Sequence, residues 1–220
     1  MVPDKQKKGA ELRKVSDMLK LLSEVDRQPL IDERDIDKRI LGNCRHFALL
    51  LCSILRYQGV PARTRCGFAT YFTPGMYDEH WLCEYWDIGK NKWILVDPQL
   101  GIIDISNDEF ISGDRAWQMC RAGKGDAELF GIDDMHGLWF VRGDLVRDAA
   151  SLFKMELLPW DSWGIINGDD KDISKTDLEF LDGLAGLMND ITRNFNKLKS
   201  TYESDKRINV SDSFLNEILK

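Results

Sequence analysis

The most regular hydrophobic pattern in the first half of the chain follows Cys44. Apolar residues recur at three- and four-residue steps, at Phe47, Ala48, Leu51, Ile54 and Leu55. This is the spacing of a helix that buries one face. Asn43 is suited to cap the start of such a helix, and Gly59 followed by Pro61 is typical of a left-handed end. The sequence therefore predicts a core helix with a thiol in its first turn.

The same helical period appears at both ends of the chain. From Ala10 it predicts an amphipathic helix that ends before Pro29, and Asp32 could cap a second, short one. Asp144 to Met155 also has a helical pattern. Ser174 is suited to cap a long helix with an apolar stripe at Leu178, Leu181, Leu184, Leu187, Met188, Ile191, Phe195 and Leu198. That helix could dock on the rest of the protein or form a homo-oligomer with a second protomer.

Strand patterns occupy the stretch between these helices. Residues 62–68 alternate between apolar and polar positions, which predicts a half-buried strand. Residues 78–86 and 93–98 read as two more strands, and the turn residues 89–92 between them predict a hairpin. We therefore expect an α+β fold, in which helices at both ends of the chain accompany an antiparallel sheet.

Composition and charge narrow the classes of function. The 220 residues are 43% hydrophobic and 30% charged, and they carry a net charge of −7, which argues against a nucleic-acid-binding surface. No apolar run has the length of a membrane span, and the N-terminus lacks a signal-peptide core. Five cysteines without a C-x-x-C pair suggest neither a disulfide framework nor a zinc ribbon. We expect a cytoplasmic protein with no membrane partner, no cofactor and no metal site.

Cys44, His80 and Asp97 are the candidate catalytic residues. A thiol at a helix N-terminus lies at the positive end of the helix dipole, which predicts a stabilised, nucleophilic thiolate. Such a nucleophile needs a base and a group that orients the base. If the hairpin forms, His80 near the start of one strand lies opposite Asp97 near the end of the other. His46 is a poor base, because two residues along a helix turn it about 200° away from Cys44.

Several linked motifs resemble the transglutaminase-like superfamily, a branch of the papain-type thiol enzymes. They are Gly42-Asn43-Cys44 with the following Leu-rich helix, Gly59-Val60-Pro61-Ala62-Arg63, His80 with Glu84 four residues later, and Trp93-Ile94-Leu95-Val96-Asp97-Pro98. Later segments, among them residues 138–143 and 158–164, resemble an uncharacterised bacterial subgroup. The resemblance implies that Cys44 is the nucleophile, His80 the general base and acid, and Asp97 the orienting carboxylate. Many family members carry Trp directly after the cysteine, where this chain has Arg45.

The resemblance also implies a fold and an activity. The fold would be a papain/transglutaminase-like core, with the nucleophile at the N-terminus of a central helix packed on the sheet. We expect residues 1–165 to form this domain with its N-terminal helices, and residues 166–220 to form a helical extension. The activity would be acyl transfer from amide bonds through a thioester, more hydrolytic than cross-linking, on a peptide, protein or small amide substrate. The alternative is a catalytically silent binding or scaffold protein with the same fold.

Three questions stay open at the level of sequence. Asp78 and Glu79 could bind a cationic group of a substrate, or they could be solvated loop charges. The aromatic turn with Trp160 and Trp163 could shape a pocket over the cleft, or it could close the core. Glu84, on a partly buried face, needs a partner, for which Arg63 and Arg65 are the candidates. The remaining cysteines read as core thiols.

Overall fold

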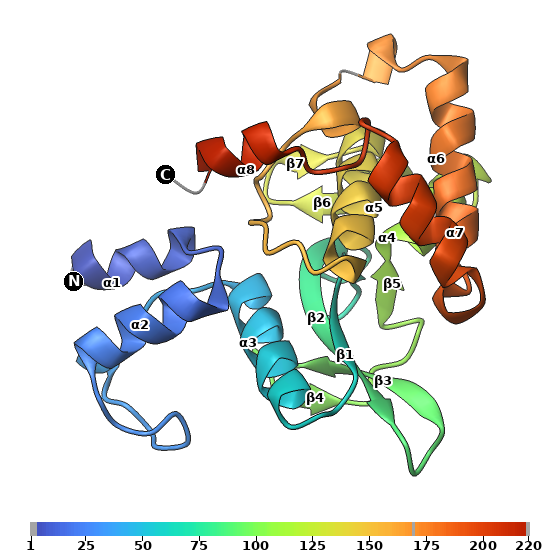
Figure 1. The fold of residues 1–220 in the computed structure, drawn as a ribbon. Coiled ribbons are helices and arrows are strands. Elements are labelled where there is room, and N and C mark those ends of the chain that lie inside the picture. Colours follow the sequence, from blue (N-terminus) through green and yellow to red (C-terminus); the bar gives the residue numbers. More distant parts are fainter. Residues whose placement is uncertain (1–3, 169, 219–220) are drawn as a thin grey trace.

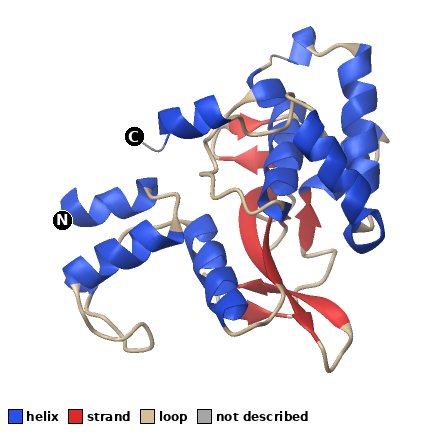
Figure 2. Ribbon diagram, in the orientation of Figure 1, coloured by secondary structure: helices blue, strands red, loops and turns tan. Residues whose placement is uncertain are grey.

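A twisted sheet stands at the centre of the computed structural model, which describes residues 4–168 and 170–218 (Figures 1 and 2). Its main path runs β4-β3-β2-β1-β5, and β6 pairs with β2 and β7. The strands are β1 (Ala62–Ala69), β2 (Tyr77–Asp87), β3 (Lys92–Asp97), β4 (Ile102–Ile103), β5 (Phe110–Ser112), β6 (Phe130–Ile132) and β7 (Met135–His136). The α+β prediction is confirmed. The sheet departs from a purely antiparallel one, because β6 pairs with β2 in parallel.

The predicted hairpin is present as β2 and β3. Their register places Trp86 opposite Trp93 and Cys83 opposite Val96. On its other side β2 pairs with β1, where His80 lies opposite Gly67. β1 and β2 thus form the middle of the sheet, and this is where helix α3 packs.

Helix α3 (Cys44–Tyr57) covers one face of β1 and β2. Its buried residues Ala48 and Cys52 pack against small and aromatic side chains of the two strands, namely Ala62, Cys66, Trp81 and Cys83. The predicted end of the helix is confirmed. Gly59 has φ +82°, and the N–H of Val60 donates to the carbonyl of Leu55 at 2.9 Å.

A second group of helices occupies the part of the molecule above and to the right of α3 in Figure 1, and two of them, α4 and α5, pack on β1. It consists of α4 (Gly113–Arg121), α5 (Leu138–Leu152), α6 (Lys175–Met188), α7 (Ile191–Ser204) and α8 (Asp212–Ile218). Helix α5 begins six residues earlier than the helix expected from Asp144. Because every residue from Phe140 to Leu152 is buried, α5 has no polar face from which a helical period could be read.

The single long helix predicted after Ser174 is two helices. Ser174 caps α6 as predicted, since its hydroxyl oxygen accepts from the N–H of Asp177 at 3.1 Å. Asp190 then caps a separate helix, α7, by accepting from the N–H of Arg193 at 3.0 Å. The two helices pack against each other and bury Leu181 and other apolar residues in the cluster that contains α5. The domain boundary at residue 165 stays a prediction.

The N-terminal segment lies beside α3 as α1 (Asp4–Lys7), a 3-10 turn (Lys8–Glu11) and α2 (Val15–Val25). The helix expected from Ala10 therefore starts only at Val15. Of the second short helix, the structure has a 3-10 turn at Ile36–Lys38. The remaining 3-10 turns are Ala127–Leu129, Gly164–Asn167 and Asp170–Asp172.

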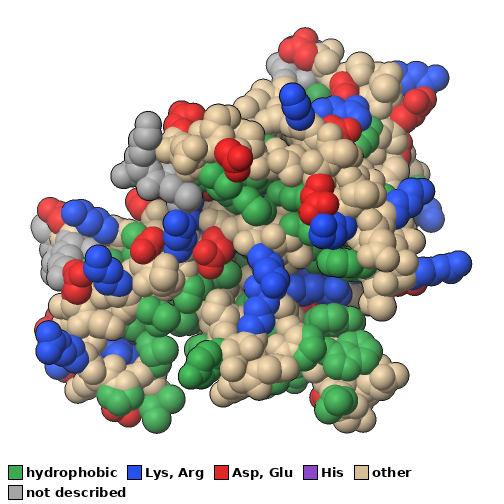
Figure 3. All heavy atoms as spheres, viewed as in Figure 1, with side chains coloured by type: hydrophobic (Ala, Val, Ile, Leu, Met, Phe, Trp, Pro, Cys, Tyr) green, Lys and Arg blue, Asp and Glu red, His purple; other side chains and the backbone are tan. Residues whose placement is uncertain are grey.

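Acidic and basic side chains are interspersed on the face shown in Figure 3, with hydrophobic side chains between them. Within residues 4–168 and 170–218, no helix combines the length and the hydropathy that crossing a membrane requires.

Candidate active site

Cys44 is the first residue of α3 and is half-buried against the sheet. It packs on Ala48, Cys66 and Trp81. Its sulfur accepts hydrogen bonds from the backbone N–H groups of Arg45 and Trp81. The thiol therefore stands against strand β2 one residue after His80.

His80 and Asp97 meet across the β2–β3 hairpin, as the sequence predicts. The Nε2 of His80 lies 2.8 Å from Oδ2 of Asp97, and both side chains are buried. Nε2 therefore carries the proton and donates it to the carboxylate, because an ionised carboxylate can only accept. This leaves Nδ1 of His80 as the ring nitrogen that can take a proton.

Asp97 is held by three further hydrogen bonds. Its Oδ2 accepts from the hydroxyl of Tyr71 at 2.9 Å, and its Oδ1 accepts from the N–H groups of Gln99 (2.9 Å) and Leu100 (3.1 Å). Burial alone would raise the pKa of Asp97, but the hydrogen bonds from His80, Leu100 and Tyr71 outweigh it and lower that pKa. Asp97 is thus kept ionised and fixed as a partner for the imidazole.

Tyr71 is a site residue that sequence reasoning missed. It follows β1 in a loop, and its ring meets His80 edge-on, with centroids 6.1 Å apart. The ring of Phe72 lies closer to His80, at 4.9 Å. No local pattern distinguishes Tyr71 from the other aromatic residues of the chain, because only the fold of the loop brings it to His80. The place of Phe72 agrees with the position of its loop directly before the strand that carries His80.

The pKa of the Cys44 thiol is raised, which differs from the thiolate expected at a helix N-terminus. Burial is the largest cause, and the negative charges of Glu79 and Asp97 add to it. The N–H groups of Trp81 and Arg45 lower the pKa but do not compensate. In the free protein Cys44 is therefore a neutral thiol, and a base must remove its proton when it reacts.

A cavity of about 450 Å³ opens beside Cys44. It is lined by Asn43, Cys44, Glu79, Ile132, Asp133, Met135, Trp139, Phe140, Arg147, Pro159, Trp160, Ser162 and Ile166. Trp160 stands at the cavity and is 51% exposed, whereas Trp163 is buried and donates to the carbonyl of Ile208 at 2.9 Å. Each interpretation of the aromatic turn therefore fits one of its two residues: Trp160 lines the pocket, and Trp163 closes the core.

The sequence model of the transglutaminase-like superfamily matches residues 13–98. This segment contains Cys44, His80 and Asp97, together with α2, α3 and strands β1 to β3. This part of the chain belongs to the transglutaminase-like superfamily. No curated protein and no solved structure has significant similarity to the chain.

Arg45 follows Cys44 in the first turn of α3. Its side chain is buried and points to the N-terminal segment, where it donates to the carbonyls of Leu12 (3.1 Å) and Arg13 (2.5 Å). Burial lowers the pKa of Arg45 to about 10, so it keeps its charge at neutral pH. Arg45 therefore ties α3 to the N-terminal segment and does not line the cavity.

His46 has a structural role in the transglutaminase-like domain. Its Nδ1 accepts from the backbone N–H of Asn43 at 3.2 Å, which completes the capping box of α3. Its Nε2 lies 3.1 Å from the carbonyl of Leu12 and donates to it. Burial lowers the pKa of His46 to about 4, so this ring stays neutral and is no base for Cys44.

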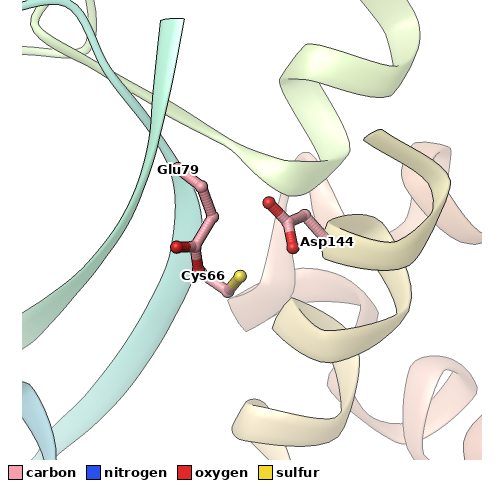
Figure 4. A group of neighbouring side chains, drawn as sticks. All are labelled: Cys66, Glu79 and Asp144. Atoms are coloured by element: carbon pink, nitrogen blue, oxygen red, sulfur yellow. The ribbon is translucent and has the colours of Figure 1, made fainter. Parts of the chain in front are cut away.

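Beside the cavity, three buried side chains converge between the sheet and α5. Figure 4 shows Glu79 and Cys66 on the strands and Asp144 on the helix, with their polar atoms turned toward one another. Their ligating atoms all lie within 4.8 Å, so by distance this set could hold a metal ion. Arg147, whose Nη1 donates to Oδ1 of Asp144 at 3.0 Å, already supplies a positive charge there.

The carboxyl groups of this cluster are protonated more readily than usual. Burial raises the pKa of Glu79 to about 8 and that of Asp144 to about 6, although the positive charge of Arg147 lowers both pKa values. The Nε1 of Trp81 donates to Oε1 of Glu79 at 2.5 Å. Asp78, by contrast, faces its own loop and accepts from the N–H of Thr73 at 2.9 Å.

Proposed function

We propose that the protein is a thiol-dependent acyl-transfer enzyme that cleaves amide bonds through Cys44, His80 and Asp97. The observation that carries the proposal is the buried His80–Asp97 hydrogen bond of 2.8 Å on the strand against which the Cys44 thiol stands. The cavity at Cys44 supplies room for an acyl group. Membership of residues 13–98 in a superfamily that contains thiol enzymes supports the same chemistry.

In this mechanism His80 accepts the proton of Cys44 at Nδ1, and the sulfur attacks the carbonyl carbon of the amide. The carbonyl oxygen becomes an oxyanion, which the free backbone N–H of Cys44 at the start of α3 can stabilise. The carbon–nitrogen bond then breaks, and His80 gives its proton to the departing amine. Asp97 stabilises the imidazolium between these two steps.

Water completes the cycle. His80 removes a proton from a water molecule, the hydroxide attacks the thioester carbon, and the acid is released as the sulfur regains a proton. We favour hydrolysis over cross-linking because Met135, Trp139 and Trp160 at the cavity are exposed, so that water can reach the thioester. An amine that enters in place of water would give transamidation.

The rival function is a binding or scaffold protein that keeps the fold without catalysis. Such a protein has no need for a base that is oriented by an ionised, four-fold hydrogen-bonded carboxylate. The Asp97 network therefore favours the enzyme.

The test is to trap the acyl-enzyme. The protein is mixed with an activated ester, quenched in acid, and the mass gain is assigned to a peptide. We expect an acyl group on Cys44 that is lost in water. No thioester should form in Cys44→Ala, and in His80→Ala it should form at a strongly reduced rate. Cys120→Ser is the matched control, because Cys120 is also a half-buried free thiol. Equal acylation of Cys44 in wild type and His80→Ala would refute the triad.

A further inference from the structure

Two acidic side chains, Glu79 and Asp133, line the cavity beside Cys44. Glu79 is only 7% exposed, and Asp133 lies in the loop between β6 and β7. Within the part of the chain that the structure describes, no Lys, Arg or His forms an ion pair with either carboxylate. A buried carboxylate of this kind is costly unless a positive charge joins it.

Among the described residues, Arg147 is the one cationic side chain in the lining, and it is already engaged. Its Nη1 donates to Oδ1 of Asp144 at 3.0 Å, and its Nε donates to the carbonyl of Asp161 at 3.3 Å. Arg147 and Asp144 therefore neutralise each other to a first approximation. The other ionisable side chains of the lining, Glu79 and Asp133, are both acidic, and the charge of Arg147 lowers the pKa of Glu79 without pairing with it.

The walls of the cavity suit the same kind of ligand. Trp139, Phe140 and Trp160 line it, together with aliphatic residues. Aromatic faces attract a cation through their quadrupole, and they also bury an apolar stem. A volume of about 450 Å³ is large enough for one extended side chain.

We propose that this cavity is a specificity pocket for a substrate group with a guanidinium or ammonium at the end of an apolar stem, bound by Glu79 between the aromatic walls. The inference rests on the proposed function, in which the acyl group sits at Cys44. It answers the question that the sequence left open for the two acidic residues before His80. Asp78 binds its own loop, whereas Glu79 faces the pocket.

Binding of a cation should release a proton from the pocket. Glu79 lies close to Asp144 and Arg147 of α5, Cys66 of β1 and the Cys44 thiol of α3, and the charge of its neighbour His80 also acts on it. Because the pKa of Glu79 is about 8, this carboxyl group is protonated in most molecules at pH 7 and must ionise when the cation binds. Affinity should therefore rise as the pH increases from 6.5 toward 8.5, which is the direction expected for an acid that must lose its proton.

The experiment measures binding without turnover, in the Cys44→Ala protein by titration calorimetry. The probes are N-acetyl-arginine amide and N-acetyl-citrulline amide, which have nearly the same shape but differ in charge. We expect arginine to bind at least about tenfold more tightly than citrulline. Its binding enthalpy should differ between buffers of different ionisation enthalpy, because a proton is released.

Two variants in the same Cys44→Ala background locate the effect. Glu79→Gln should abolish the preference for arginine, and Asp78→Asn should keep it, because Asp78 lies next to Glu79 but binds Thr73. Circular dichroism checks that both variants are folded. If Glu79→Gln does not fold, the Cys44→Ala protein still tests the pocket, through its relative affinity for the arginine and citrulline probes and through the release of a proton.

Equal affinities for the two probes, no measurable binding of arginine, or an arginine preference that survives in folded Glu79→Gln would overturn the pocket assignment. None of these results affects the acyl-enzyme test. Conversely, arginine binding without acylation of Cys44 in the wild type would keep the cation pocket and refute the enzyme.

Discussion

At the scale of single residues, Asp97 is the best-determined part of the site. Four donors surround its carboxylate, and they come from β2, from the loop after β1 and from the turn that follows Asp97 itself. Such a carboxylate fixes the tautomer of His80, so that Nδ1 rather than Nε2 is free to accept a proton.

Replacement of Asp97 by Asn tests this role. The amide cannot stabilise an imidazolium by charge and can bind the wrong tautomer, so we expect acylation of Cys44 to slow by roughly 10²- to 10⁴-fold. The rate is measured by the mass assay at neutral pH. Tyr71→Phe is the control, because it removes one of the four hydrogen bonds, and its rate should fall by less than that of Asp97→Asn. A larger loss in Tyr71→Phe would contradict this order.

The raised pKa of Cys44 makes a second prediction at this scale. Since burial and nearby carboxylates disfavour the thiolate, less thiolate is present at pH 7 than in a free cysteine, whose pKa is about 8.5. We expect iodoacetamide to label Cys44 more slowly than it labels the thiol of glutathione. The rate for Cys44 should keep rising above pH 9. Glu79→Gln should shift the profile to lower pH, because above about pH 8 it removes the negative charge that acts most strongly on Cys44. Labelling that reaches a plateau below pH 8 would contradict the assignment.

At the scale of elements, α3 is defined by the way it begins and ends. The reciprocal capping of Asn43 and His46 starts the helix at Cys44, and Gly59 ends it in the left-handed region. The position of the thiol thus depends on local chemistry at the helix termini. Packing of Ala48 and Cys52 on β1 and β2 then holds the helix against the strand that carries His80.

Gly59→Ala and Gly183→Ala form a matched pair at this scale. Nothing lies within 4 Å of a Cβ at either position, but Gly59 has φ +82°, whereas Gly183 lies inside α6. We expect Gly59→Ala to lower the free energy of unfolding by about 1 kcal/mol because of backbone strain. Gly183→Ala should raise it by roughly 0.5–1 kcal/mol, since alanine favours the helix. Urea unfolding measures both, and changes of the same sign would refute the explanation.

At the scale of the whole molecule, a buried ion network joins the sheet to the second group of helices. The guanidinium of Arg65 on β1 donates to Asp148 of α5 at 2.8 and 2.9 Å and to Asp114 of α4 at 3.2 Å. Glu84 of β2 lies 3.5 Å from Arg65 and 2.5 Å from Arg63. Both partners proposed for Glu84 from the sequence are therefore confirmed, and the network holds one arrangement of β1, β2, α4 and α5.

Arg65→Met should be strongly destabilising. It leaves carboxylates buried without their cation, so we expect a loss of about 3–5 kcal/mol in the free energy of unfolding. Arg121→Met is the control, because its ion pair with Asp182 joins α4 to α6 at the surface. There we expect a loss of about 0–1 kcal/mol. Similar losses in the two variants, measured by urea unfolding, would contradict the role of the buried network.

The sequence by itself determined the local features of this protein. Periodicity, caps and turn residues predict α3, the β2–β3 hairpin and the start of α6, because each depends on neighbours a few residues away. The motifs around Cys44, His80 and Asp97 indicate the superfamily for the same reason. The start of α5 was missed because the helix is buried on all sides and shows no clear period. The break between α6 and α7 was missed because the cap at Asp190 lies within a continuous apolar stripe.

Only the tertiary structure decided what surrounds the candidate triad. Tyr71 reaches Asp97 from 26 residues away in the sequence, and Asp144 and Arg147 of α5 set the electrostatics under Glu79. The raised pKa of Cys44 likewise follows from burial and from charges on β2 and β3. These effects depend on distances between side chains that lie far apart along the chain, and such distances exist only once the helices have packed on the sheet.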